Sequence, residues 1–395
     1  MMIEHSGVRA NRHPPRSFLL PLCLVLGISA GLTGCAGWFT PPAGIGSEVA
    51  WSRLPGWGRD TQGAAWPALR KSCDKLAARE RSWEELCRAA SALESPDDQT
   101  ARVFFETHFR AHRLNPGEGR EGLITGYYEP VLKGSNVRSE RFRWPLYKRP
   151  NNLLIVDLAS LYPELKGRPV RARVEGNRVV PYYSRTEIGS ARNPLAGNEL
   201  VWVDDPVEAF VLQVQGSGRV QLPDGSQMAL GYADQNGHPY RSLGGRLIEL
   251  GMLTREEVTL TRIREWLAAH PQEIGALLDS NPSYIFFTQR DISLDGPLGS
   301  LGVPLTPDRS AAVDVAYVPL GAPLWLDTKL PDGTPLQRLT LAQDTGGAIK
   351  GAARADLFIG QGAAAGHLAG EMKQPGRLYV LLPKASPPVS ASAPQ

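Results

Sequence analysis

Two aspartates in a glycine-rich segment near the C-terminus are the residues of this chain best suited to chemistry. Asp344 and Asp356 are twelve residues apart, and five glycines lie close to them. Glycine loses much backbone entropy on folding, so it is best tolerated where the backbone turns sharply or a ligand comes close. Paired carboxylates at such a surface are typical of acid–base catalysis on a glycosidic bond. The alternative is that both are turn residues.

A third aspartate, Asp314, follows the apolar run 311–313. Aspartate is disfavoured inside strands, so three of them on apolar, β-rich segments need an explanation. One explanation is a shared polar site on a small barrel.

The triplet Asp344-Thr345-Gly346 also occurs in aspartic proteases. Those enzymes need two such triplets, because two carboxylates share one proton. This chain has one triplet, and Gly347 stands where Ser or Ala is usual. A homodimer would have to supply the second copy, so a protease is the less favoured interpretation.

The elements that must position these residues change along the chain. Residues 64–113 keep a helical spacing of apolar residues, with Val103, Phe104 and Phe109 as core candidates. From Gly122 onward, short apolar runs cut by Gly, Pro and Asn predict strands, with a helical interlude at 242–279. The expected strands include 153–156, 200–203, 209–214, 284–288, 312–318, 323–327, 339–343 and 377–382.

Residues 1–34 have the pattern of a bacterial lipoprotein signal peptide. Three arginines precede an apolar run at 18–32, and small residues lead to Cys35. Cleavage before Cys35 would leave its thiol for a lipid that holds the mature N-terminus on a membrane. A transmembrane anchor is less favoured, because the run is shorter than ~20 residues and contains Pro21.

Ala36 follows Cys35, where an aspartate is the familiar signal for retention in the inner membrane. We therefore expect the mature protein to be anchored on the periplasmic face of the outer membrane.

Residues 35–60 contain many Pro, Gly, Trp and Ser and predict a tether. Residues 385–395 are rich in Ala, Ser and Pro and predict a disordered tail.

Charge and cysteine content narrow the class of protein. The net charge is +3, but it falls to +1 without the signal peptide, so it gives no argument for nucleic acid. Cys73 and Cys87 lie outside the reducing cytoplasm if the signal is real. A disulfide between them is then plausible, and two unpaired buried thiols are the alternative.

No metal or organic cofactor is expected. His108 and His112 have helical i,i+4 spacing, but the residues between them lack the glutamate of metalloproteases. We interpret this pair as a solvated or partly packed helix face.

Four motifs in a fixed order make the chain resemble a known family. They are TGYYEP at 125–130, VQGSG at 214–218, NPSYIFF at 281–287 and QDTGGAIKG at 343–351 with ADLFIGQG at 355–362. With Val313-Asp314 and VPLG at 318–321, the last motif is similar to the three-aspartate domain, a double-psi β-barrel. From about Leu123 to Leu382 the chain resembles the membrane-bound lytic murein transglycosylase A family.

The resemblance implies a mainly β fold with peripheral helices. The double-psi β-barrel domain, 61–130 together with 284–384, would be interrupted by an inserted β-rich domain at 131–283. A groove between the two would hold a glycan strand.

The resemblance also implies the reaction. The family cleaves the β-1,4 bond between N-acetylmuramic acid and N-acetylglucosamine without water, and the muramyl C6 hydroxyl closes a 1,6-anhydro ring. Asp356 matches the aspartic acid that protonates the bridging oxygen. Asp344 would orient the side chain of Asp356 or stabilise the positive charge that develops on the sugar. Asp344 is also the second candidate for the acid itself. Asp314 would be more structural, and it is counted among the substrate-binding residues.

A general acid must be protonated near neutral pH, whereas a free aspartate has a pKa of ~3.9. Burial and a nearby carboxylate both raise the pKa. The apolar neighbours of Asp356 fit this need. The polar and glycine neighbours of Asp344 favour its ionised form.

Several further side chains are candidates for contact with glycan. Aromatic, amide, hydroxyl and ammonium groups can stack on sugars or bind their acetamido groups. The candidates are Tyr127, Tyr128, Gln213, Gln215, Ser217, Asn236 and Lys350.

Each candidate also has a structural interpretation. The tyrosines can pack in the core, and Gln213 and Gln215 can line an expected strand edge. Asn236 lies in a turn-like segment. Lys350 can balance the acids or be exposed. Glu129 departs from the small polar residue expected at that point of the family, and nothing in the sequence explains it.

The implied partners are peptidoglycan glycan strands and a membrane, reached through the lipid on Cys35. Cell-wall synthesis proteins are further candidates, no nucleic acid is expected, and the chain is expected to be a monomer. The second interpretation is a non-catalytic peptidoglycan-binding lipoprotein.

Overall fold

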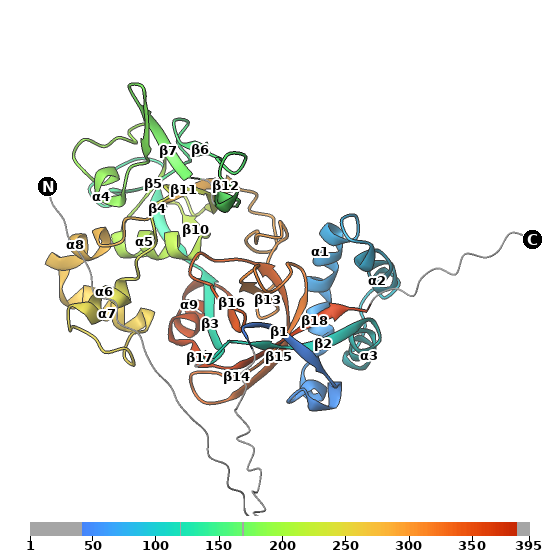
Figure 1. Ribbon diagram of the computed structural model, residues 1–395. Helices are drawn as coiled ribbons and strands as arrows, with labels where there is room; N and C mark the ends of the chain where they lie inside the picture. Colours follow the sequence, from blue (N-terminus) through green and yellow to red (C-terminus); the bar gives the residue numbers. More distant parts are fainter. Residues whose placement is uncertain (1–41, 119, 168–169, 385–395) are drawn as a thin grey trace, which may run out of the picture. The chain divides into compact units, whose positions relative to one another are not determined.

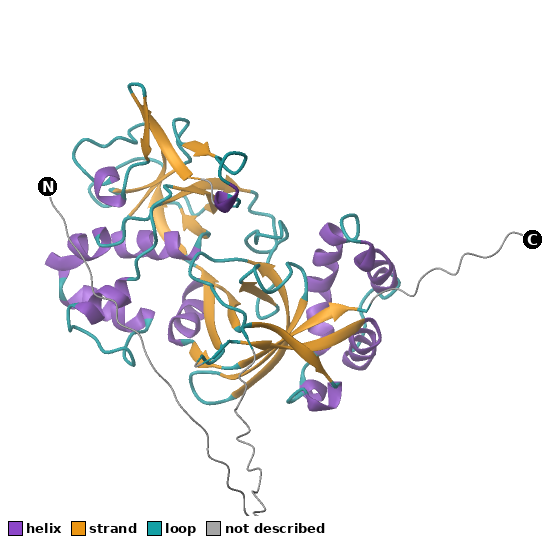
Figure 2. Ribbon diagram, viewed as in Figure 1, coloured by secondary structure: helices purple, strands orange, loops and turns teal. Residues whose placement is uncertain are grey.

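The computed structural model describes residues 42–118, 120–167 and 170–384. Strands dominate this part of the chain, and helices flank them (Figures 1 and 2). Within it, no helix is both long and apolar enough to cross a membrane. The expected signal peptide, the lipid site at Cys35 and the expected C-terminal tail lie outside the described residues.

The helices and strands keep their order along the chain. The helices are α1 (Trp66–Leu76), α2 (Arg81–Ser91), α3 (Asp98–His108), α4 (Arg185–Ile188), α5 (Pro206–Gln215), α6 (Leu243–Glu249), α7 (Leu260–Ala269), α8 (Ile274–Asp279) and α9 (Gly362–Glu371). The strands are β1 (Gly44–Val49), β2 (Phe109–Asn115), β3 (Leu123–Glu129), β4 (Val131–Ser135), β5 (Trp144–Tyr147), β6 (Leu154–Val156), β7 (Val170–Glu175), β8 (Arg178–Pro181), β9 (Glu199–Val203), β10 (Gly218–Gln221), β11 (Gln227–Gln235), β12 (Ile285–Arg290), β13 (Ser310–Val313), β14 (Pro323–Lys329), β15 (Pro335–Asp344), β16 (Arg354–Gln361), β17 (Lys373–Pro375) and β18 (Arg377–Pro383).

The first sheet joins the two ends of the described chain. Among the described residues it has nine strands in the order β1-β2-β18-β14-β15-β13-β16-β3-β17. Two of its pairs, β13 with β15 and β3 with β16, are parallel. The mainly β fold with peripheral helices is confirmed. The ladder of hydrogen bonds does not close, however, because β1 and β17 remain at its two ends.

The chain between β3 and β13 forms two further sheets. As far as the structure describes them, their orders are β12-β11-β10-β4-β9-β5 and β6-β7-β8. The sequence analysis placed the strand near 284–288 in the barrel, but β12 pairs with β11 in this second sheet. The reason is packing, since Phe286 and Phe287 are fully buried among residues of the inserted segment.

The run 209–214 is helical, so the predicted strand there is wrong. It lies in α5, where Asp205 caps the N-terminus, Pro206 takes a first-turn position and Gly216 ends the helix with a left-handed backbone. Residues 209–213 of this helix are buried, so polar residues do not mark a helical period there. A short, mostly apolar run does not by itself distinguish strand from helix.

The expected tether is wrong for its described part. Strand β1 pairs with β2, and Trp57 is buried with its indole N–H donating to Glu106 Oε1 at 2.8 Å. These residues therefore belong to the folded body. The core prediction for Val103 is also wrong, because it is 50% exposed on α3 while Phe104 and Phe105 face the interior.

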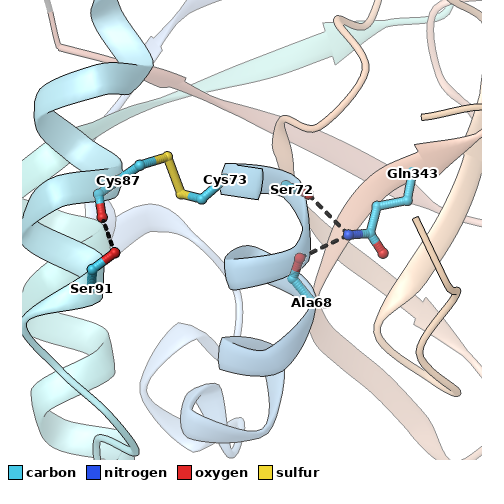
Figure 3. The surroundings of a disulfide bond; sticks show 6 residues. All are labelled: Ala68, Ser72, Cys73, Cys87, Ser91 and Gln343. Carbon is cyan, nitrogen blue, oxygen red and sulfur yellow. Dashed lines mark hydrogen bonds between the residues drawn. A yellow bond between two sulfur atoms is a disulfide. The ribbon is translucent and has the colours of Figure 1, made fainter. Parts of the chain in front are cut away.

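A disulfide links the first two helices, as the sequence analysis allowed. Cys73 on α1 is bonded to Cys87 on α2, with a Cα–Cα distance of 5.4 Å (Figure 3). On the other side of α1, Gln343 Nε2 donates to Ala68 O at 2.7 Å and to Ser72 Oγ at 2.9 Å. Helix α1 is thus linked to α2 by the disulfide and to the C-terminal end of strand β15 by the Gln343 hydrogen bonds.

A buried charge cluster lies where the chain passes from β3 to β4. Glu129 is 1% exposed. Its carboxylate accepts from Arg219 Nε of β10 at 3.1 Å and from Arg290 of β12. A buried carboxylate is costly unless it is paired and hydrogen-bonded. Two arginines of the second sheet therefore account for Glu129, which the sequence left unexplained, and fix the end of β3.

We expect the Cys73→Ala/Cys87→Ala variant to have a free energy of unfolding about 3 kcal/mol below wild type. The disulfide joins two cysteines that are 14 positions apart in the sequence, and the closed loop lowers the conformational entropy of the unfolded chain. Urea denaturation, with and without reductant, measures the difference. Reductant should lower the stability of wild type and leave the variant unchanged. Two free thiols in oxidised wild-type protein would contradict the crosslink.

Candidate active site

Strand register brings two of the three aspartates onto one face of the first sheet. Ala312 on β13 is the register partner of Asp344 on β15 and of Asp356 on β16. A bulge lets Gln343 turn into the core against α1 and sets Asp344 opposite Ala312. Register partners project from the same face. The two carboxylates therefore flank the small Ala312 side chain, with about 10 Å of sheet between their backbones.

Asp344 is a carboxylate with many donors. Oδ1 accepts from Ser300 N at 2.9 Å, Ser300 Oγ at 3.0 Å and Thr345 N at 2.9 Å. Oδ2 accepts from the Tyr127 hydroxyl at 2.9 Å. Burial raises the pKa of Asp344, and these four hydrogen bonds act in the opposite direction because they favour the charged form.

Asp356 has fewer donors. Its Oδ1 accepts from the Thr125 hydroxyl on the neighbouring strand β3. Burial raises the pKa of Asp356, and the charge of Asp344 raises it further, while Arg354 and Thr125 lower it. The pKa of both carboxyl groups is raised, but four hydrogen bonds favour the charged form of Asp344 and only one favours that of Asp356, so Asp356 is the better suited to hold a proton. This is the division of roles that acid-assisted cleavage requires.

Tyr127 shows how strongly the first sheet curves. It lies on β3, three positions from β15 in the strand order, yet its hydroxyl reaches Asp344. Its ring packs against Phe358 with centroids 5.3 Å apart. Burial and the neighbouring carboxylate raise the pKa of Tyr127 well above its usual range, so it remains a neutral donor. The structure therefore brings Tyr127 into the site.

Asp314 and Lys350 lie at the loop that joins β15 to β16. Asp314 accepts from Ala316 N at 3.1 Å and Gly351 N at 2.8 Å, and Gly351 has a φ of 113° that favours glycine. Asp314 thus anchors the loop, and its part in substrate binding stays a prediction. Lys350 is exposed, and in the part of the chain that is described no ion pair joins it to the aspartates.

Tyr128 lies on the other side of β3 from Tyr127. Its ring packs against α9, where a Cβ at Gly366 would approach it to 2.7 Å. Arg264 donates to its hydroxyl at 2.8 Å, and its backbone N–H donates to Gln215 Oε1 at 3.0 Å. The structure therefore separates Tyr128 and Gln215 from the two acids.

Gln213 and Asn236 are buried and bonded within the protein. Gln213 Oε1 accepts from Arg185 at 2.5 Å. Asn236 donates to two backbone carbonyls and accepts from Tyr284 N. Ser217 is partly exposed in the turn after α5. Between these three side chains and the acids, no hydrogen bond is found in the described residues, so their role in glycan binding stays a prediction.

The sequence analysis missed three residues of the site. Thr125 and Arg354 contact each other, with Arg354 Nη2 donating to Thr125 Oγ1 at 2.8 Å, and Ser300 binds Asp344. Arg354 precedes Asp356 by two positions on one strand, so alternation was a usable signal for it. Nothing in the sequence marks Ser300. Within the described ranges, no group of three or more His, Cys, Asp or Glu side chains is placed to share a metal ion.

Comparisons with known proteins give the following matches. The family model of the MltA specific insert domain matches residues 123–288, and that of the 3D domain matches 309–382. Membrane-bound lytic murein transglycosylase A of Escherichia coli K12 is 33% identical over 267 residues. That match covers 65% of this chain, and the chain spans 65% of the length of this curated relative.

Solved structures match over more of the chain. The membrane-bound lytic murein transglycosylase of Agrobacterium tumefaciens has a TM-score of 0.77 and 32% identity, with 86% of this chain and 98% of that chain covered. Escherichia coli MltA with bound chitohexaose has a TM-score of 0.65 and 27% identity, with 87% and 95% covered.

We expect Tyr127→Phe to raise the pKa of Asp344. The hydroxyl donates to the ionised carboxylate and so lowers the pKa in the wild type, and phenylalanine removes that donor without changing the packing of the ring. Carboxyl ¹³C NMR titration measures the shift. Tyr128→Phe, on the other side of β3, is the matched control and should leave Asp344 unchanged. Equal titration of Asp344 in Tyr127→Phe and wild type would contradict the contact.

Proposed function

The chain belongs to the membrane-bound lytic murein transglycosylase A family, and we propose that it cleaves peptidoglycan glycan strands without water. The bond cut is the β-1,4 bond between N-acetylmuramic acid and N-acetylglucosamine, and the product carries a 1,6-anhydro ring. The names of the relatives support murein as the substrate. A related structure that holds chitohexaose supports a site for β-1,4-linked sugars.

One observation carries the proposal: two carboxyl groups on one sheet face flank Ala312 and differ in their hydrogen bonds. Asp356, with one donor, is the general acid. Asp344, with four hydrogen bonds, stays ionised and stabilises the positive charge that develops at C1.

A single aspartate serves both proton transfers. Asp356 gives its proton to the bridging oxygen as the bond to C1 breaks. The resulting carboxylate then takes the proton of the muramyl C6 hydroxyl as that oxygen attacks C1 on the same sugar. The enzyme group returns to its starting state, and no water enters the product.

We further propose that the mature chain is lipid-anchored at Cys35 on the periplasmic face of the outer membrane. The name of the relatives, membrane-bound lytic murein transglycosylase A, supports a membrane location. We assign catalysis to residues 61–130 with 291–384, and glycan binding to the inserted segment 131–290, which includes β12. Cell-wall synthesis proteins remain proposed partners.

The Asp356→Asn variant should lose at least about 100-fold in rate, because asparagine has no proton to give. Mass spectrometry of products from purified sacculi measures this, with the form lacking residues 1–35. Wild type and the exposed turn variant Asp332→Asn should both release anhydro-muropeptides.

Other products would overturn the proposal. Reducing-end muropeptides from wild type would identify a water-using hydrolase. Binding of sacculi without any product would identify the non-catalytic lipoprotein. Full activity of Asp356→Asn would refute the assignment of the acid.

The Asp344→Asn variant should lose activity at a lower pH than wild type. The Asp344 charge raises the pKa of Asp356, so its removal lowers that pKa. Since Asp356 must be protonated, the alkaline limb of the pH–rate profile then moves to lower pH. The rate on the plateau should also fall, because a stabilising charge is lost. An unmoved alkaline limb would show that the two carboxyl groups are not coupled.

A further inference from the structure

Arg354 places a cation next to the proposed acid without pairing with it. Arg354 and Asp356 are two residues apart on β16, so their side chains project from the same face. The guanidinium donates to Thr125 Oγ1 at 2.8 Å and to Ala355 O at 2.5 Å. In the described part of the chain, Arg354 forms no ion pair with a carboxylate within 4.0 Å. Its nearest link to Asp356 runs through Thr125.

This link fixes the direction of the Thr125 hydroxyl. A guanidinium can only donate, so Thr125 Oγ1 must accept from Arg354. The hydroxyl has one hydrogen of its own. Among the described residues, the acceptor for that hydrogen is Asp356 Oδ1. The hydroxyl hydrogen therefore points at Oδ1, and that oxygen is held as an acceptor.

We propose that Arg354 acts through Thr125 as a positioning residue that keeps the acid proton of Asp356 on Oδ2. The inference rests on the proposed function of Asp356. No described residue is hydrogen-bonded to Oδ2, so this oxygen is the one left for the substrate. A carboxylic acid with its proton on the oxygen bonded to Thr125 would present no proton to the glycosidic oxygen.

The chemical step balances with Oδ2 alone. The Oδ2–H bond breaks and an O–H bond forms on the leaving oxygen, while the electrons of its bond to C1 go to that oxygen. The C6 oxygen then forms a bond to C1, and its proton returns to Oδ2. Oδ1 keeps its hydrogen bond from Thr125 throughout, which stabilises the carboxylate intermediate.

An indirect contact also avoids an electrostatic conflict. Among the described residues, the charged and titratable groups that face Asp356 are Arg354 on its own strand, Asp344 on β15 and the Tyr127 phenol on β3. The Arg354 charge lowers the pKa of Asp356, and a direct ion pair would strengthen that effect and keep the acid ionised. Contact through a hydroxyl orients the group with less of this penalty.

The test compares Arg354→Met, Arg354→Lys, Thr125→Val and the double variant Arg354→Met/Thr125→Val. We expect Arg354→Met to lower kcat about 10- to 100-fold with little change in KM, because a misdirected proton affects the chemical step. Its alkaline limb should move to higher pH, because loss of the positive charge raises the pKa of Asp356. Arg354→Lys should restore most of kcat, since an ammonium group also donates.

The double variant distinguishes a positioning role of Arg354, which acts through Thr125, from a direct effect of its charge on Asp356. In the Thr125→Val background, Arg354→Met should cost kcat little more, yet still move the alkaline limb. Arg110→Met on β2, which breaks an exposed pair with Glu48, is the matched control and should change neither quantity. Circular dichroism confirms that each variant is folded.

Two outcomes would overturn the inference while wild type still makes anhydro-muropeptides. One is Arg354→Met with unchanged kcat and a moved alkaline limb, which indicates charge alone. The other is an equal loss of kcat in the wild-type and Thr125→Val backgrounds, which indicates independent roles. If wild type itself makes no anhydro product, the proposed function fails, and the inference that rests on it fails too.

Discussion

The parallel pairing of β3 with β16 is the interaction on which the rest of the site depends. It joins segments 231 residues apart, with Asp356 in register with Thr125 and Phe358 with Tyr127. On the opposite face, buried Ile124, Ala355 and Leu357 hold the pair in the core. A slip of one residue would turn Asp356 into that apolar layer. Pairing therefore decides which side chains can reach the substrate, before any hydrogen bond of the site forms.

Three supports hold the second acid in place. Gln343 is tied to α1, and the disulfide ties α1 to α2 (Figure 3). Ser300 donates hydrogen bonds to Asp344 from both its backbone N–H and its hydroxyl. Asp314 anchors the loop to β16 at Gly351. Helix α1 thus supports Asp344 through its hydrogen bonds with Gln343 on β15, although no described side chain of α1, α2 or α3 is hydrogen-bonded to Asp344 or Asp356.

Much of this arrangement could be predicted from the sequence, but not its register. Glycine-flanked aspartates and the motif at 125–130 identified Asp344, Asp356 and Tyr127, because chemistry restricts residue type locally. The strand predicted at 209–214 is wrong because this mostly apolar run shows no helical period of polar residues. Strand β12 was assigned to the wrong sheet because partners of a strand are set by packing far along the chain. Ser300 could not be predicted, because its contact with Asp344 joins segments 44 residues apart, whereas alternation with Asp356 could have pointed to Arg354.

The long separation between β3 and β16 has a consequence for the newly made chain. Synthesis proceeds from the N-terminus, so Thr125 and Tyr127 emerge first, while the three aspartates come from the last quarter of the sequence. A polypeptide that ends before Asp314, or whose last quarter has not yet crossed a membrane, has Thr125 and Tyr127 in place but none of the three aspartates. Under the proposed function, the cell is thereby protected from a wall-cutting activity until a complete molecule has folded.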